Sequence, residues 1–388
     1  MSKVRIDGPR GCTAEDLDEL VALVSGIFRP DGFQDIRTDY PLVYRDENLP
    51  NIRLIRAAGQ IVAEVPFVPW TVAHEGCRFT IAVISPTATH VDHRHKGYGL
   101  RCLNSCIECM ALQGIDLAVL WTMVKTFRFY NHAAFEGVRD QGHTFPCGRG
   151  DASRFEHHGE QVVDYDPRSR QYLVDIMSMH EAEPFGFVRN VDRAATFYSL
   201  PLLTTHLALR GGEPAAYLCV SRSSNKPGII EAGGDSDGVE TLVHHALASL
   251  ADDNPVTVHT SLCPTVLYEL MHAKVADRRG GSGENTMLRI NDIPGFLGRI
   301  APWLERRNAG TDASVSIRVT DADQTVSLDF RGGRLSIGTE RRTQHLELTR
   351  LELTSAVFGP HPASPFQTPP PLDLLFPFYF PIAVLDRS

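Results

Sequence analysis

The stretch 94–110, RHKGYGLRCLNSCIECM, holds two overlapping patterns that point to different chemistry. Its first half has Arg94, Gly97 and Gly99 at the spacing R-x-x-G-x-G, after a β-rich run and before a helical one. Successive backbone N–H groups in such a turn, together with the dipole of the following helix, attract an anion. The spacing therefore predicts a phosphate-binding loop. A Rossmann loop is not predicted, because it needs G-x-G-x-x-G and a downstream acid in a parallel unit.

The second half of the stretch carries Cys102, Cys106 and Cys109, whose spacing C-x-x-x-C-x-x-C also suggests an iron–sulfur cluster. Apolar side chains recur at helical spacing from 100 to 113, and Gly114 stands where a helix commonly ends. On that helix the three cysteines share one face with the apolar stripe. Because buried free cysteine behaves as a small apolar side chain, we interpret them as core residues and predict no cluster.

Three histidines, His90, His93 and His95, lie just before and within the glycine loop. Alternate residues of an extended segment share a face, so three imidazoles could converge on a zinc ion. The segment coincides with the anion loop, however, and no Asp, Glu or His at a fixed spacing completes a ligand set. The sequence therefore predicts no metal site.

Composition places the chain among ordinary globular proteins. Its 388 residues are 43% hydrophobic and 22% charged, which predicts two or three folded domains. The formal charge is −9, from 38 Lys and Arg against 47 Asp and Glu, so we expect no nucleic-acid partner. No run is apolar enough to span a membrane, the N-terminus shows no signal-like apolar segment, and eight scattered cysteines follow no secreted pattern. We expect no membrane partner and a cytoplasmic location.

The order of predicted elements divides the chain into three units with an α/β (α+β) fold. The first, 1–150, is predicted to hold a helix, a hairpin, an extended run, a helix, a strand and a helix, at 13–27, 51–70, 77–91, 100–113, 115–122 and 124–138. The second, 151–285, echoes that order without the glycine loop, at 168–184, 207–222, 228–234, 238–253 and 255–262. The third, 286–388, has helices at 293–308 and 345–359 around strands at 314–338, and its aromatic end, 374–388, is expected to be buried.

The first unit resembles the GNAT acetyltransferase superfamily. The carrying segments are THVDHRHKGYGLRCL (89–103), the helix and strand that follow it, and FRFYNHAAFEGV (127–138), which is similar to the family's F-Y-x-x-x-G-F pattern. Two positions depart from the family: Ala134 replaces the usual glycine before a phenylalanine, and Met123 stands where an asparagine is common. We expect the first change to tighten packing and the second to remove one cofactor hydrogen bond.

The layout of the whole chain is similar to the narrower Eis-like (enhanced intracellular survival) acetyltransferases. That resemblance implies an acetyl-coenzyme A-binding GNAT domain, a degenerate second GNAT domain and a C-terminal sterol-carrier-like domain, in a homo-oligomer that is typically a hexamer. It also implies acetyl-coenzyme A as co-substrate and no metal. The residues expected to pair with its pantetheine arm are Ala88, Thr89, His90 and Val91. Those expected at the pyrophosphate are Arg94, His95, Lys96, Gly97, Tyr98, Gly99 and Leu100.

The same resemblance assigns two catalytic groups. Tyr130 matches the tyrosine that donates a proton to the departing coenzyme A thiolate, a role that a phenol with a pKa near 10 can fill only when it lies beside the sulfur. The C-terminal carboxylate of the chain, carried by Ser388, would act as the base or orient the amine. An aromatic last residue is expected in that family, so Ser388 provides the carboxylate without the apolar anchor.

These observations predict an N-acetyltransferase that acts on amines by direct transfer in a ternary complex. The alternative is a non-catalytic coenzyme A- or lipid-binding scaffold in which the second and third units carry the function. The intact glycine loop favours the enzyme. The acceptor stays open among small molecules and peptides, with aminoglycosides, polyamines and lysine side chains all compatible.

Overall fold

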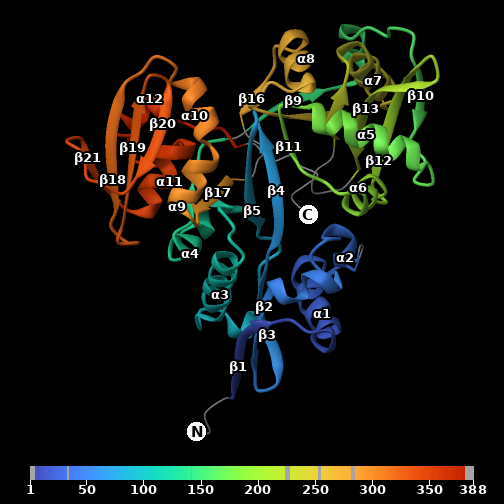
Figure 1. Ribbon diagram of the computed structural model, residues 1–388. Coiled ribbons are helices and arrows are strands. Elements are labelled where there is room, and N and C mark those ends of the chain that lie inside the picture. Colours follow the sequence, from blue (N-terminus) through green and yellow to red (C-terminus); the bar gives the residue numbers. More distant parts are fainter. Residues whose placement is uncertain are drawn as a thin grey trace.

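The computed structural model describes residues 5–32, 35–140, 142–222, 228–251, 255–280 and 285–380, and the structural statements below concern those residues. The described chain is a mixed α/β structure with four β-sheets (Figure 1). Blue to green marks the first unit, green to yellow the second, and orange to red the third. None of the described helices is long and apolar enough to cross a membrane.

The first sheet has the antiparallel strand order β1-β2-β3-β6: Ile6–Gly11, Ile52–Ala57, Gln60–Pro66 and Ala88–Thr89. β2 and β3 form the predicted hairpin, with Gly59 at φ +88° in its turn. Figure 1 shows α1 (Leu17–Phe28) and α2 (Ile36–Asp39) on one side of this sheet and α3 (Tyr98–Leu112) on the other. Alternate side chains of β2 and β3 therefore fill two different cores.

The second sheet joins all three units in the order β11-β4-β5-β7-β17-β8: Phe185–Phe187, Val68–His74, Cys77–Val83, Leu117–Thr122, Asn285–Ile290 and Glu136–Gly137. Short helices η1, η2, η3, η4 and α4 complete the first unit: Ala14–Asp16, Asp46–Asn51, Val91–His93, Val124–Thr126 and Phe127–Asn131. β5 and β7 run parallel, with α3 as the crossover between them. The start of α3 and the start of α4 therefore lie at the same edge of the sheet.

The third sheet has the order β10-β12-β13-β14-β15-β9-β16: Gln161–Asp164, Leu203–Arg210, Glu213–Ser221, Gly228–Gly234, Val256–Ser261, Gly142–Cys147 and Arg279–Gly280. Its helices are η5, α5, α6, α7 and α8: Arg149–Arg154, Arg170–Ala182, Val191–Tyr198, Ser236–Ala248 and Val266–Lys274. β14 and β15 run parallel with α7 as their crossover. The first and second units thus each contain one pair of parallel strands joined by a crossover helix.

The fourth sheet belongs to the C-terminal unit, with the order β20-β19-β18-β21: Arg334–Gly338, Gln324–Arg331, Ala313–Val319 and His345–Leu348. Its helices are α9, α10, α11 and α12: Ile293–Arg299, Ala301–Arg307, Arg350–Phe358 and Leu372–Leu375. β18 pairs antiparallel with β19 and parallel with β21.

The phenylalanines of the aromatic C-terminal run are buried, as the sequence predicts, whereas Leu374 at its start is 68% exposed. Phe376, Phe378 and Phe380 are at most 1% exposed. The ring of Phe378 lies 6.0 Å from that of Phe79 on β5 and 4.9 Å from that of Trp303 on α10. This run therefore fastens the C-terminal unit to the second sheet. Residues 381–388, which include Ser388, lie outside the described residues.

Two predicted helices are wrong in extent. The helix predicted at 124–138 is only η4 and α4, because the chain turns at Ala134 (φ +59°) and then joins β17 as β8. The helix predicted at 345–359 begins as β21, since the alternating residues HLEL pair with β18. Helix α11 starts only after Thr349, which forms a capping box with Glu352.

The helix predicted at 293–308 is two helices, α9 and α10, which meet at Ile300. Two strands also cross the predicted unit boundaries. β9, before residue 150, pairs with β15 of the second unit. β17, from Asn285, pairs with β7 of the first. Local sequence patterns carry no information about such long-range pairing.

Candidate active site

The glycine loop joins β6 to α3 at the carboxyl edge of the parallel strands. Ala88 and Thr89 are extended in β6, His90 caps η3, and Val91 is the first residue of η3. Gly97 adopts φ +79° as the N-cap of α3, with no other atoms within 4 Å of the place where a Cβ would stand. Since left-handed backbone is costly for other residues, glycine here lets the loop turn directly into the helix.

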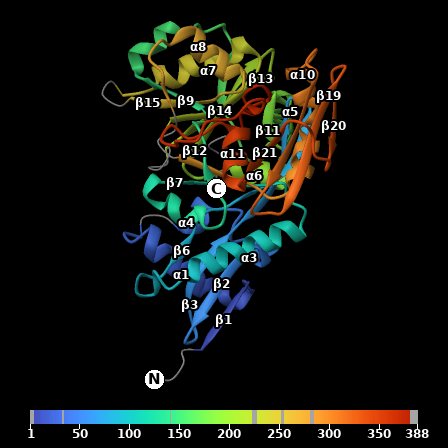
Figure 2. The same cartoon turned by 90° about the vertical axis from the view of Figure 1, so that its left-hand side faces the viewer.

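The start of α3 is open to an anion. No side chain caps the helix, and its first internal bond runs from the N–H of Arg101 to the carbonyl of Gly97. The N–H groups of Tyr98, Gly99 and Leu100 are therefore the unpaired donors that every helix start leaves. Figure 2 shows α3 lying along the sheet of β1, β2 and β3.

Positive charge surrounds this helix start. Arg94, His95 and Lys96 are exposed, and His95 has φ +59°. Arg94 Nε donates to the Thr89 carbonyl at 3.3 Å, and Lys96 Nζ donates to the Asp92 carbonyl at 2.7 Å. Within the described residues neither cation is in an ion pair, so both remain available to neutralise phosphate groups.

Strand β6 links this loop to the predicted acid. A Cβ on Gly99 would stand 3.1 Å from Thr89 Oγ1 and 3.4 Å from the Phe129 ring, so α3 approaches both β6 and α4 closely. Thr87, just before β6, shares a side-chain hydrogen bond with Tyr130. The predicted loop residues and Tyr130 are thus brought together from segments more than thirty positions apart.

Tyr130 lies on α4, is 9% exposed and packs edge-on against Phe129 at 4.8 Å. Burial raises the pKa of its phenol, the Thr87 hydrogen bond opposes that rise, and the charge of Glu64 adds to it. The phenol is therefore protonated at neutral pH. A buried, protonated hydroxyl is a suitable proton donor for a thiolate.

Glu64 is a candidate site residue that the sequence reasoning missed. It lies on β3 opposite Ala88 of β6, is 0% exposed, and neither carboxyl oxygen has a partner of good hydrogen-bond geometry among the described residues. Burial raises the pKa of this carboxyl well above its usual value, and the Ala88 N–H offsets the rise only in part. A lone glutamate in the apolar run IVAEVPFVPW was the signal in the sequence.

Other ionisable side chains surround Glu64 without pairing with it. Its charge raises the pKa of Cys12, Tyr44, Cys102, Cys106 and Tyr130. The hydroxyl of Tyr44 likewise has no hydrogen-bond partner in the part of the chain that the structure describes. An unpaired buried carboxyl costs free energy, and such costs concentrate at functional sites.

Two of the three cysteines of α3, Cys102 and Cys106, are core residues, as predicted, while Cys109 is partly buried and packs against the same core. Cys102 and Cys106 are 0% exposed, and their thiols point to the carbonyls of Ala63 and Val65 at 3.8 and 3.1 Å. Burial raises the pKa of Cys102 to about 12. In the part of the chain that the structure describes, no three His, Cys, Asp or Glu side chains are placed to hold a metal ion.

The two departures from the GNAT pattern flank Tyr130 in the sequence. Ala134 occupies a left-handed turn between α4 and β8, the conformation for which the usual glycine is suited. The structure adds that this position carries backbone strain, because a left-handed φ is costly for alanine. Met123 precedes η4 with 58% of its surface exposed.

Comparison with known proteins identifies the class. Residues 9–136 match the family profile described as an acetyltransferase (GNAT) domain. The matched segment contains the glycine loop and Tyr130, so residues 9–136 are similar to a GNAT acetyltransferase domain, as the motifs predict. No curated protein matches the sequence.

Solved structures share the fold of nearly the whole chain. It superimposes on a GCN5-related N-acetyltransferase from Anabaena variabilis with TM-score 0.67 at 16% identity, covering 91% of this chain and 89% of that one. With another GCN5-related N-acetyltransferase, from Kribbella flavida, the TM-score is 0.65 at 17% identity, covering 91% of this chain and 88% of that one. With Eis1 from Mycobacterium abscessus the TM-score is 0.59 at 14% identity, covering 92% of this chain and 90% of that one. Residues 9–136 are thus similar to a GNAT acetyltransferase domain, and the whole chain shares its fold with these N-acetyltransferases and with Eis1.

Proposed function

We propose that the first unit transfers an acetyl group from acetyl-coenzyme A directly to an amine, within a ternary complex. The observation that carries the proposal is the uncapped, basic start of α3, directly after β6, inside the segment that matches the GNAT acetyltransferase family. Such a helix start binds phosphate through N–H groups and charge.

The proposed cofactor contacts follow the loop. The N–H groups of Tyr98, Gly99 and Leu100, with Arg94 and Lys96, would hold the pyrophosphate. The extended backbone of Ala88 and Thr89, continued by His90 and Val91, would guide the pantetheine arm. When bound, acetyl-coenzyme A supplies the thioester that the amine attacks.

Tyr130 would act as the acid. The amine nitrogen attacks the thioester carbonyl carbon, the carbon–sulfur bond breaks, and the leaving thiolate takes the Tyr130 proton. Thr87 orients the phenol, and burial keeps it protonated until the thiolate forms.

Two carboxyl groups could receive the proton that the amine must lose. The Ser388 carboxylate is the group that the family resemblance assigns. Glu64 is a second candidate, because it lies opposite Ala88 and its charge raises the pKa of Tyr130. A raised pKa makes its carboxylate a stronger base, and an arriving ammonium group would stabilise that carboxylate.

The first experiment is calorimetric titration of the full chain with acetyl-coenzyme A. We expect micromolar binding that Arg94→Ala weakens by about tenfold, since one charged contact to phosphate is lost. Gly97→Val should abolish it, because valine does not adopt φ +79° without strain. No detectable binding to the wild-type protein would demote it from an enzyme to a scaffold.

Kinetics then separate the two carboxyl groups. Glu64→Gln should lower kcat/KM for the amine by about tenfold or more while leaving acetyl-coenzyme A affinity unchanged. Glu183→Gln is the matched control, because burial also raises the pKa of that carboxyl, to about 7, in the second unit. Residues appended after Ser388 should impair turnover only if the terminal carboxylate takes part.

We further infer that the second unit is a degenerate GNAT domain, the third a sterol-carrier-like domain, and the protein a cytoplasmic homo-oligomer. The shared crossovers of α3 and α7 support the first point. The eight cysteines, all free thiols, support a reducing compartment. The unit boundaries at 150 and 285 stay predictions. Sedimentation of the purified protein would test the oligomer.

A further inference from the structure

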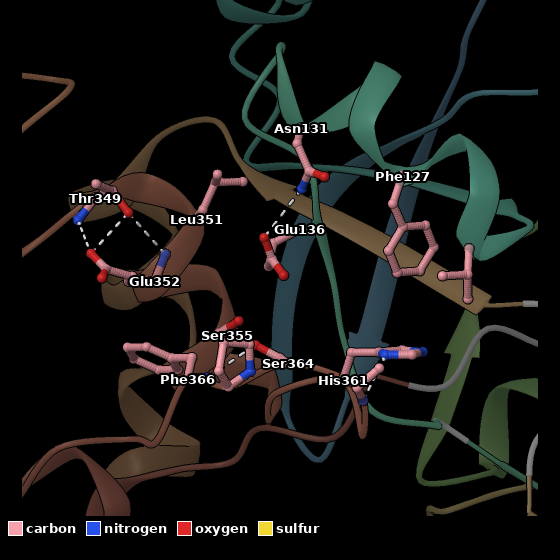
Figure 3. A pocket seen from close by; sticks show the side chains of 13 residues that line it. Phe127, Asn131, Glu136, Thr349, Leu351, Glu352, Ser355, His361, Ser364 and Phe366 are labelled. Atoms are coloured by element: carbon pink, nitrogen blue, oxygen red, sulfur yellow. Dashed lines mark hydrogen bonds between the residues drawn. The ribbon is translucent and has the colours of Figure 1, made fainter.

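A cavity of about 620 Å³ lies between the first and the C-terminal units (Figure 3). Helix α4 and strand β8 supply one wall, with Phe127, Asn131 and Glu136. Helix α11 and the loop that follows it supply the other. Its volume is within the range of small-molecule sites. None of the residues that line it takes part in the proposed acetyl transfer.

The ionisable side chains that line the cavity are those of two glutamates and one histidine, and the lining includes no lysine or arginine. Glu352 is committed to its helix, since it accepts the N–H and hydroxyl of Thr349 at 2.7 and 2.9 Å. His361 lies 3.0 Å from Asn285 Oδ1 through Nε2 and accepts the Ala363 N–H at Nδ1. Both ring nitrogens of His361 are therefore occupied within the protein.

Glu136 is therefore the acid left to meet a ligand. Figure 3 shows its side chain in the space between α4 and the C-terminal wall. Its carboxylate accepts a long hydrogen bond, 3.3 Å, from Asn131. Burial raises its pKa to about 7, and the Gly137 N–H opposes that rise, with no charged side chain contributing. A cation would stabilise the carboxylate by supplying the missing charge.

Apolar side chains frame this acid. Phe127 and Val124 stand on one wall, and Leu351 and Phe366 on the other. The Phe127 ring meets the His361 ring edge-on at 5.3 Å. An occupant must therefore combine a positive group with an apolar body.

We propose that this cavity is a second small-molecule site, separate from the acetyl-transfer site, which binds an amphipathic organic cation with its ammonium group at Glu136. The site stands whether or not the first unit transfers acetyl groups, because no step of that reaction is used in the inference.

The test localises binding by thiol protection in the full chain. Ala363→Cys places a reactive thiol at an exposed position of the wall, and the parent protein gives the background from its own cysteines. The probe is 2-phenylethylammonium, and 2-phenylethanol is its uncharged counterpart. The ratio of alkylation rates with and without probe is measured from pH 6 to pH 8.5.

We expect the cation to protect about tenfold more effectively than the alcohol at pH 8, since its ammonium pairs with an ionised acid. Protection should weaken below about pH 7, where Glu136 takes up a proton. Adding Glu136→Gln should remove the advantage of the cation, whereas Glu183→Gln should keep it. Equal protection by the alcohol, no protection, or protection that survives Glu136→Gln would each overturn the proposal. Melting curves confirm that the variants are folded.

Discussion

The first and second units each bury a glutamate, but the surroundings of its carboxyl group are opposite in the two units. Glu231, on β14, accepts two bonds from Arg189 at 2.8 and 2.6 Å and the hydroxyls of Tyr198 and Tyr217 at 3.0 and 3.1 Å. Burial opposes its ionisation, but Arg189 outweighs burial and lowers the pKa. Glu64, on β3, has no such partners and a raised pKa. A satisfied buried acid stabilises a fold, whereas an unsatisfied one is available to a ligand.

The two crossover helices differ in the same sense. The start of α3 has no side-chain cap and lies among exposed cations. The start of α7 is capped by Asp235, whose carboxylate accepts the Gly238 N–H at 2.8 Å and pairs with Arg210 at 2.7 Å. An aspartate thus occupies, with its own negative charge, the place where a phosphate would bind. The start of α7 is thus closed by a side chain, whereas the start of α3 is open.

The largest expected effect is a loss of stability when Glu231, the ion-paired buried acid, is replaced. Glu231→Gln leaves the Arg189 guanidinium buried without its counter-charge, so the free energy of unfolding should fall by about 3–5 kcal/mol. Denaturant unfolding at pH 7 measures it. Glu64→Gln, the matched variant, breaks no ion pair and should cost much less; equal losses would remove the distinction between the two acids.

The pH dependence of these variants sharpens the same contrast. Because the folded pKa of Glu64 is raised, the folded protein holds a proton that the unfolded chain has lost above about pH 4.3. Stability from this group is full below that pH and falls as pH rises towards the folded pKa, a loss that Glu64→Gln should abolish. Glu231 has the opposite sign, since its stabilisation is lost as pH falls through its lowered folded pKa.

The next expected effect is on turnover, which a tyrosine of the first unit should control and a tyrosine of the second should not. Tyr130→Phe should lower turnover by about a hundredfold or more, because no proton donor then meets the thiolate. Tyr268, on α8 after the second parallel pair, is partly exposed, and its ring lies 4.0 Å from that of His272, so Tyr268→Phe should leave turnover unchanged. Steady-state acetylation of an amine panel measures both. An unaffected rate in Tyr130→Phe excludes the acid role.

A smaller effect is expected at the capped helix. Asp235→Ala removes the α7 cap and one ion pair, so the free energy of unfolding should fall by about 1 kcal/mol. Acetyl-coenzyme A affinity, measured by calorimetry, should be unchanged. A weaker affinity would mean that the second unit contributes to the cofactor site.

Local sequence predicts much of this site because its signals are local. Gly97, Arg94 and the start of α3 are fixed by a strand, a turn and a helix within a short segment. Tyr130 came from the family pattern, and the burial of Cys102 and Cys106 from helical periodicity. Each of these depends on spacing along one element.

What the sequence did not predict depends on partners distant along the chain. The sequence of β3 does not tell that Glu64 becomes buried without an ion-pair partner, since its neighbours Ala88 and Tyr130 arrive from later segments. Likewise β21 is a strand because β18 pairs with it, although its residues also suit a helix. The pairing of β9 and β17 with sheets of other units is decided by tertiary packing.

The smallest expected effect tests the turn that carries Tyr130. Ala134 adopts φ +59°, which costs an alanine about 1 kcal/mol and a glycine almost nothing. Glycine loses more entropy on folding, so Ala134→Gly should stabilise the protein by only about 0.5 kcal/mol, measured by thermal and denaturant unfolding. The corresponding change in a right-handed residue of a helix, Ala111→Gly on α3, should instead destabilise the protein by about 1 kcal/mol. Opposite signs for these two substitutions would confirm strain at the turn, and a shared sign would show that the turn at Ala134 is relaxed.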